Sequence, residues 1–123
     1  MKNVLLVFLG GGLGSVLRYF IGKYMNNPVS GIPYGTFTAN ILGSLLIGVI
    51  LGLAAKNNAL SQNQTLLLAT GFSGGFTTFS TFAYENYIYL KSGDFASFAL
   101  YSIASFVIGF LAVFFGLFLA RSF

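Results

Sequence analysis

Few residues in this 123-residue sequence could do chemistry, because it has no cysteine, no histidine and only two acidic residues. Without thiols and imidazoles, the usual nucleophile, the usual general base and the usual zinc ligands are missing. Glu85 and Asp94 lie nine residues apart and do not form the paired carboxylates of a hydrolase. We therefore predict that the chain is not an enzyme, and that its amides and hydroxyls bind ions.

The densest run of unusual residues is 70–82. Within it, the three glycines Gly71, Gly74 and Gly75 are followed at once by a run of four hydroxyl residues: Thr77, Thr78, Ser80 and Thr81. Each glycine costs a helix about 1 kcal/mol against alanine, so we expect the helix to be interrupted here. Carbonyls freed by such a break suit a cation, and the N-terminus of the following half-helix suits an anion. The alternative is a simple glycine kink, with hydroxyls bonding back to carbonyls one turn earlier.

Two other features could contribute to an ion site. Asn40 offers two N–H donors and is either an ion ligand or a hydrogen-bonding contact between helices. Phe79 and Phe82 are three residues apart, hence on one helical face, and their positive ring edges could line an anion path. The same spacing also fits ordinary core residues.

A third polar feature lies in the last apolar stretch. Four residues recur there every fourth position and share a helical face: Ser97, Tyr101, Ser105 and Gly109. This face could be a polar track or a packing seam.

We expect membrane helices to hold these residues in place. Only 7% of the residues are charged, against about 25% in soluble domains. Four apolar stretches are long enough to cross a bilayer: residues 4–25, 34–55, 65–90 and 95–120. We expect one all-α transmembrane domain over residues 1–123, in which the third helix is broken mid-membrane. We expect this multi-pass protein to lie in the cell (inner) membrane.

Basic residues divide evenly between the two ends of the expected bundle. One end carries Lys2, Lys56 and Arg121, and the other carries Arg18, Lys23 and Lys91. Positive charge favours the cytoplasmic side, so this balance predicts either a weak bias or insertion in both orientations. Oppositely oriented copies could then pair about a twofold axis in the membrane plane. The basic residues stand singly and form no patch for nucleic acid.

Small residues are spaced for close helix contact. Gly10 and Gly14 form a GxxxG pair in the first stretch, and Ser44, Gly48 and Gly52 form a stripe in the second. Such stripes let helix backbones approach closely in lipid. They predict a tight bundle.

Three segments together resemble the fluoride-channel family, the small bacterial exporters called Fluc or CrcB. Residues 11–19 (GGLGSVLRY) resemble its first-helix signature, residues 35–44 (GTFTANILGS) its second, and residues 71–85 (GFSGGFTTFSTFAYE) its third. The departures are mild: Ser73 stands where a cysteine is frequent, and Phe76 where a leucine is frequent.

The resemblance implies a passive, fluoride-selective channel that lets cytoplasmic fluoride escape and so lowers its toxicity. It implies an antiparallel, dual-topology homodimer with two pores, and a structural Na⁺ at the dimer centre on the backbone carbonyls of Gly74 and Thr77. The pore residues it implies are Asn40, Phe79, Phe82 and Thr81, with Tyr101 and Ser105 in the fourth-helix track. Arg18 and Glu85 match family positions on one side, where they could pair as structural or vestibule groups.

Two alternatives remain from the residues. A small multidrug antiporter also has four helices and dual topology, but it needs a carboxylate in the first span, and this chain has none there. A subunit that acts only in a heterodimer with a paralogous chain would have part of the machinery degraded. Here Asn40, both phenylalanines and the glycine break are retained, which favours the homodimer.

Overall fold

The structure is a computed structural model, and it describes residues 1–26, 31–56 and 59–122. Every regular element in these residues is helical, and none is a strand. The elements are α1 (Lys2–Met25), α2 (Tyr34–Ala54), α3 (Gln62–Thr65), the π-helix η1 (Leu66–Ser73), α4 (Gly74–Phe76), α5 (Phe79–Lys91) and α6 (Phe95–Arg121).

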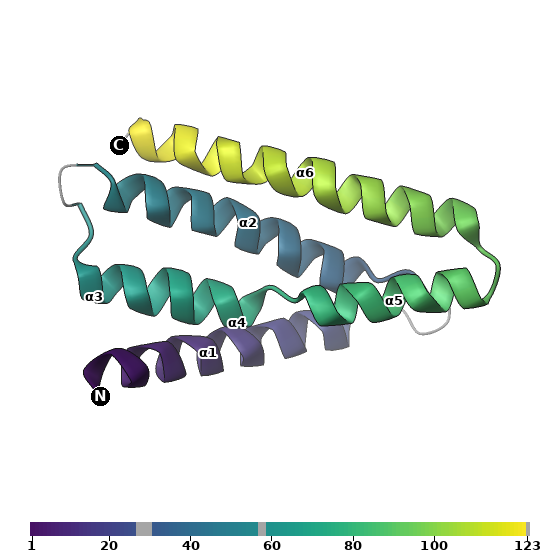
Figure 1. Cartoon of the computed structure of the whole chain (residues 1–123), viewed down its shortest axis with the longest axis horizontal. Coiled ribbons are helices and arrows are strands. Elements are labelled where there is room, and N and C mark those ends of the chain that lie inside the picture. The colour runs from purple at the N-terminus through teal and green to yellow at the C-terminus, as the bar shows by residue number, and fades with distance from the viewer. Residues whose placement is uncertain (27–30, 57–58, 123) are drawn as a thin grey trace.

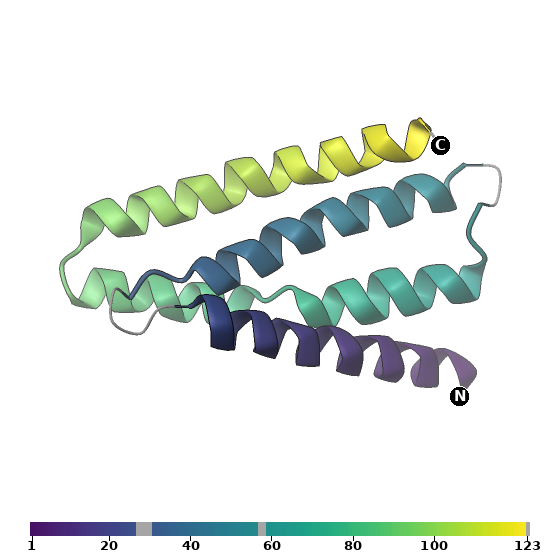
Figure 2. The ribbon, with the colours of Figure 1, turned by 180° about the vertical axis from the view of Figure 1, so that it is seen from behind.

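The elements lie lengthwise beside one another in rows, and rows that follow one another in the chain run in opposite directions (Figures 1 and 2). The neighbouring helices α2 and α6 therefore run in the same direction. Elements α3, η1, α4 and α5 follow one another along one row, between α1 on one side and α2 on the other. Helix α6 packs chiefly against α2, whereas α1 packs chiefly against η1 and α4. Both termini lie at the same end of the bundle, and the connection from α5 to α6 lies at the other.

Within the described residues, three helices are long and apolar enough to cross a membrane: α1, α2 and α6. Their composition and length identify an all-α membrane protein. The remaining apolar stretch, residues 65–90, is divided among shorter helices, and none of them alone has the length of a span.

The interruption in that row lies after the glycines. Gly71, Gly74 and Gly75 are all within helical elements, and Gly74 has ordinary helical angles (φ −63°, ψ −37°). The extended residues are Thr77 (φ −86°, ψ 157°) and Thr78 (φ −150°, ψ 119°). The break is therefore formed by two threonines, whose β-branched side chains favour extended backbone.

The glycines serve close packing against neighbouring helices. A methyl group added to Gly10 would lie 2.8 Å from the backbone nitrogen of Phe72, and one added to Gly75 would lie 2.9 Å from the Cα of Gly11. Between α2 and α6, a methyl group on Gly48 would lie 3.1 Å from the Cα of Gly116. Close backbone approach, as the small-residue stripes predict, holds both pairs of rows together.

Polar contacts at the helix ends fix the connections. The Asn26 side-chain oxygen accepts from the backbone N–H groups of Gly35 (2.7 Å) and Thr36 (3.2 Å), so the end of α1 caps the start of α2. At the opposite end, Lys56 Nζ donates to the carbonyls of Ala120 (3.2 Å) and Arg121 (3.3 Å). Lysine at this position satisfies carbonyls that α6 itself leaves open.

Candidate functional site

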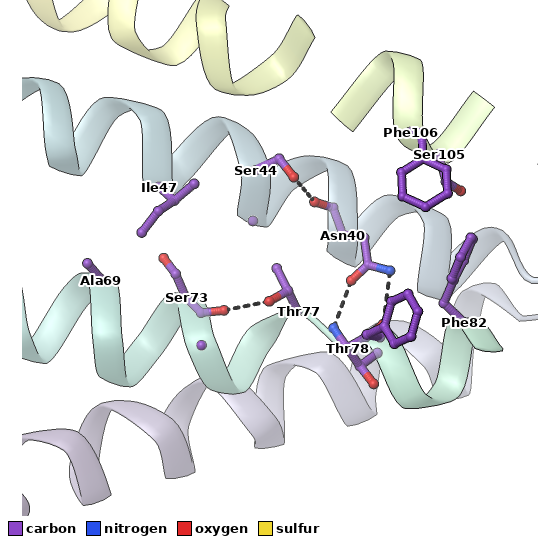
Figure 3. A pocket seen from close by; sticks show the side chains of 13 residues that line it. Asn40, Ser44, Ile47, Ala69, Ser73, Thr77, Thr78, Phe82, Ser105 and Phe106 are labelled. Carbon is purple, nitrogen blue, oxygen red and sulfur yellow. Dashed lines mark hydrogen bonds between the residues drawn. The ribbon is translucent and has the colours of Figure 1, made fainter. Parts of the chain in front are cut away.

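Asn40 on α2 holds the backbone of the break. Its side-chain oxygen accepts from the Thr78 N–H at 2.8 Å, and its Nδ2 donates to the Thr78 carbonyl at 3.2 Å (Figure 3). Because both backbone groups of Thr78 are satisfied by one side chain, extended backbone can persist without a helical neighbour. Asn40 is thus an interhelical contact, and one Nδ2 proton remains for a ligand.

A cavity of about 430 Å³ opens beside this contact, between α2, the broken row and α6. Of the predicted pore residues, it brings together Asn40, Phe79, Phe82 and Ser105. Gly74 and Thr77, the predicted carbonyl ligands, also line it. The cavity has no charged residue in its lining, so hydroxyls, an amide, backbone and aromatic rings determine what it can hold.

Phe82 is the centre of an aromatic cluster. Its ring centroid lies 5.0 Å from that of Tyr101, 5.9 Å from that of Phe79 and 6.0 Å from that of Phe106. Phe82 is buried (8% exposed), whereas Phe79 is 72% exposed. The two phenylalanines share one helical face, but in the single chain only Phe82 is a core residue.

Thr81, on α5 between Phe79 and Phe82, lines a different cavity from these two residues. It lines a separate cavity of about 210 Å³ together with Arg18, Thr36 and Thr78. Thr78 Oγ1 donates to Thr81 Oγ1 at 3.2 Å, and Thr81 N–H donates to Thr78 Oγ1 at 3.2 Å, so Thr78 caps the start of α5. The predicted pore hydroxyls of Ser105, Thr81 and Tyr101 therefore line three different cavities.

Glu85 accepts two hydrogen bonds from neighbouring helices. The Tyr101 hydroxyl donates to its Oε1 and the Thr36 hydroxyl to its Oε2, each at 2.7 Å. Both distances are ordinary for hydrogen bonds that a hydroxyl donates to an oxygen. Tyr101 lines a third cavity, of about 260 Å³, with Ser97 of the predicted track.

The proposed pairing of Arg18 with Glu85 is not what the structure contains. Arg18 Nε donates to the Gly75 carbonyl at 3.1 Å, whereas the Glu85 carboxylate is held by Thr36 and Tyr101. A helix-end carbonyl is nearby for Arg18 because α1 packs against α4 through glycines. Arg18 therefore binds α4 and borders the smaller cavity beside Thr81.

The carbonyls of Gly74 and Thr77 fit a cation site built from backbone. In a continuous helix they would accept from the N–H groups of Thr78 and Thr81, four residues on. Here the Thr78 N–H donates to Asn40 and the Thr81 N–H donates to the Thr78 hydroxyl. Among the described residues no cluster of three or more acidic side chains could hold a metal instead, so a cation here would rest on carbonyl oxygens.

Sequence reasoning gives no role at this site to Thr36, Ser73 or Phe106, and it includes Thr78 only as one of a run of hydroxyl residues. Thr36 lies four residues before Asn40 and so on the same helical face, a signal that could have identified it. Phe106 follows Ser105 in one more apolar helix, and nothing in the sequence distinguishes it from the lipid-facing phenylalanines. Ser73 and Thr78 depend on where the helix breaks, which only the structure gives.

Comparison with known proteins identifies the family of this chain. The family model for CrcB-like protein, Camphor Resistance (CrcB), matches residues 5–117. The chain belongs to the CrcB family. The match takes in nearly all of α1 and α6 and the whole broken row between them, so this CrcB-family chain shares more with its relatives than one motif.

Curated relatives of this CrcB-family chain carry one name, fluoride-specific ion channel FluC. The protein from Gloeothece citriformis is 51% identical over 122 residues, covering 98% of each chain. That from Phocaeicola vulgatus is 46% identical and covers 98% of this chain and all of its own length. That from Leptospira interrogans is 42% identical, with 99% and 97% covered.

Proposed function

We propose that this chain forms a fluoride-selective channel for passive export of fluoride from the cytoplasm. The observation that carries the proposal is the 430 Å³ cavity at the break, where an amide, a hydroxyl and phenylalanine rings meet without any charged group. Curated FluC proteins at up to 51% identity over nearly the whole chain support the choice of fluoride. The function is transport, and no step of it needs a nucleophile or a general base.

Fluoride is small and tightly hydrated, so it enters only if donors replace its water. At the cavity these are the remaining Asn40 N–H and the Ser105 hydroxyl, with positive ring edges from Phe79 and Phe82. Each group binds weakly enough to release the ion, and several in sequence allow conduction. The Thr81 hydroxyl and Arg18, in the smaller cavity, form the vestibule through which the anion reaches water.

Tyr101 and Glu85 set the far end of the path. The Tyr101 ring contacts Phe82 and its hydroxyl is bound to Glu85, so Tyr101 couples the aromatic cluster to the carboxylate. A half-buried carboxylate would repel a fluoride ion unless hydrogen bonds offset its charge, and Thr36 and Tyr101 supply two. Glu85 therefore acts as a structural anchor beside the path.

The assembly we propose is an antiparallel homodimer in the cell membrane, with the broken row as a fourth, interrupted span. Phe79 and Gly74 are exposed in the single chain beside the break, where a second copy would cover them. The balanced basic residues support insertion in both orientations. The carbonyls of Gly74 and Thr77 from two copies would hold a structural Na⁺. By binding carbonyls of both copies, this ion would hold the broken row of one copy next to that of the other.

The test is anion efflux from liposomes containing the purified chain, with fluoride and chloride electrodes side by side. Fast fluoride loss without chloride loss is the expected result. Absence of fluoride loss from a well-folded dimer would point to a missing paralogous partner, and equal loss of both halides would contradict selectivity.

Asn40→Asp is the variant to run beside it. Aspartate keeps the oxygen that accepts from Thr78 N–H but replaces Nδ2 with a second oxygen facing the Thr78 carbonyl. It also places negative charge in the anion path, so we expect fluoride efflux to fall to the level of empty liposomes. Normal efflux would remove Asn40 from the pore.

A further inference from the structure

Ser73 is the most deeply buried hydroxyl at the cavity, and its Oγ has no hydrogen-bond partner. The residue is 4% exposed. Among the described residues, three buried side-chain atoms have no partner: Ser73 Oγ, Ser105 Oγ and Asn86 Oδ1. Two of the three, Ser73 and Ser105, line the same 430 Å³ cavity. Buried polar groups are normally paired, so two unpaired hydroxyls at one cavity indicate an occupant that accepts hydrogen bonds.

Other helical hydroxyls in this chain satisfy themselves. Thr77 Oγ1 donates to the Ser73 carbonyl at 3.0 Å, and Ser44 Oγ donates to the Asn40 carbonyl at 2.8 Å, each one turn back. Ser73 is the last residue of the π-helix η1, and its hydroxyl makes no such bond one turn back. The Ser73 hydroxyl is therefore free to donate to an occupant of the cavity.

The position of Ser73 extends the line of donors across the break. Ser73 lies on the N-terminal side of Thr77 and Thr78, whereas Phe79 and Phe82 lie on the C-terminal side. Figure 3 places Ser73 on the row opposite Ile47 of α2, with Asn40 between Ser73 and Phe82. The polar lining therefore continues past Asn40 toward η1, beyond the pore residues that the sequence predicts.

We propose that the Ser73 hydroxyl is a further anion-contacting group of the conduction cavity, donating a hydrogen bond to fluoride on the η1 side of Asn40. This inference rests on the proposed function. The Ser73 hydroxyl donates its hydrogen bond either to the ion itself or to a water molecule in the pore. Flux measurements distinguish the two acceptors, because only contact with the ion changes how tightly fluoride is bound.

The experiment measures fluoride efflux as a function of fluoride concentration for the wild-type chain and Ser73→Ala in liposomes. Losing one hydrogen bond to an ion weakens its binding by about tenfold or more, so the fluoride concentration for half-maximal flux should rise or the flux should fall by about tenfold. Ser73→Cys keeps a similar volume and only a weak donor, and its flux should lie between the two. Size-exclusion chromatography checks that each variant keeps the wild-type assembly.

Ser102→Ala on α6 is the matched control, since Ser102 lines none of the cavities described above. Wild-type flux and half-saturation in Ser73→Ala would overturn the inference and leave a bound water as the occupant. An equal loss of flux in Ser73→Ala and Ser102→Ala would also overturn the inference in favour of packing. So would a Ser73→Ala variant that no longer assembles, together with a Ser73→Cys variant whose flux is as low as that of Ser73→Ala. Absence of fluoride flux from the wild-type chain would instead overturn the proposed function.

Discussion

Asn40 shows how one side chain can carry two tasks at a broken helix. An amide has an acceptor and two donors, and Thr78 uses the acceptor and one donor. The second Nδ2 proton remains for a ligand, and Asn40 lines the 430 Å³ cavity. A hydroxyl or a carboxylate could not perform both tasks, because the first has a single proton and the second has none.

Phe82→Ile tests the aromatic lining. Isoleucine keeps the residue apolar but removes the ring edge and the ring contacts with Phe79, Tyr101 and Phe106, each worth about 0.5–1.5 kcal/mol. We expect fluoride efflux to fall by about tenfold or more while the dimer persists on size-exclusion chromatography. Phe114→Ile is the control, because Phe114 is 67% exposed on α6. Efflux equal in the two variants would reduce Phe82 to core packing.

At this scale the sequence identified the residues better than their contacts. Asn40 and Ser105 could be named in advance because polar groups in an apolar chain are few, and Phe79 and Phe82 because of their spacing and the family resemblance; the structure gathers all four at one cavity. The partners could not be named. Arg18 binds a carbonyl and Glu85 two hydroxyls, and each choice depends on helix register to within one turn.

At the scale of elements, glycine works here by its size. The cluster at 71–75 predicted an interruption because glycine disfavours helix, yet these residues are helical and the threonines after them are extended. Tertiary contact overrode propensity, since α1 approaches the row so closely that only glycine fits. Propensity located the break to within a few residues, and the close contact with α1 explains Gly71 and Gly75 but not Gly74.

Gly14→Ala tests this packing. A methyl group there would lie 2.8 Å from the backbone nitrogen of Phe76 and in contact with the Phe72 carbonyl, so α1 must move away. Overpacking of this kind costs about 1–3 kcal/mol. We expect a lower thermal midpoint in detergent.

Gly12→Ala is the matched control on the same helix, because nothing lies within 4 Å of the added methyl group. It should stabilise α1 by up to about 1 kcal/mol through helix propensity. If both variants lowered the midpoint equally, helix flexibility rather than close contact would explain the glycines of α1.

Asp94 caps α6, and this cap should depend on pH. Its Oδ1 accepts from the Ser97 N–H at 3.1 Å, and the hydrogen bonds from the Ser97 hydroxyl and backbone lower the pKa of Asp94 below its ordinary value of 3.8. A lowered pKa means that the stabilisation is present above the ordinary value and is lost as the pH falls through the folded-state value.

Asp94→Asn keeps the side-chain oxygen but not the charge, so it isolates the ionic part of the cap. We expect the wild-type chain to have the higher thermal midpoint near neutral pH and the two to converge in acid. Asp94→Ala should have a lower midpoint than either at neutral pH. A wild-type advantage over Asp94→Asn that did not change with pH would contradict a charged cap.

At the scale of the whole molecule, the ends of the bundle decide its orientation. Both termini lie at one end of the bundle and the α5–α6 connection at the other (Figure 1). A chemical label attached at one end therefore reports the opposite side of the membrane from a label attached at the other end. Lys56 at the first end is bound to the last carbonyls of α6, but it still contributes positive charge to that side. Neither end therefore has an excess of basic residues to hold it in the cytoplasm.

The absence of native cysteine makes orientation directly measurable. Ser122→Cys marks the end with the termini, and Ser92→Cys marks the end with the α5–α6 connection; both serines are exposed. In intact cells treated with a membrane-impermeant maleimide, each variant should be labelled in about half of its copies if the chain inserts both ways. Lysed cells give the total for each variant. A single orientation would give full labelling of one variant and none of the other, and an antiparallel pair could not then form from copies of this chain alone.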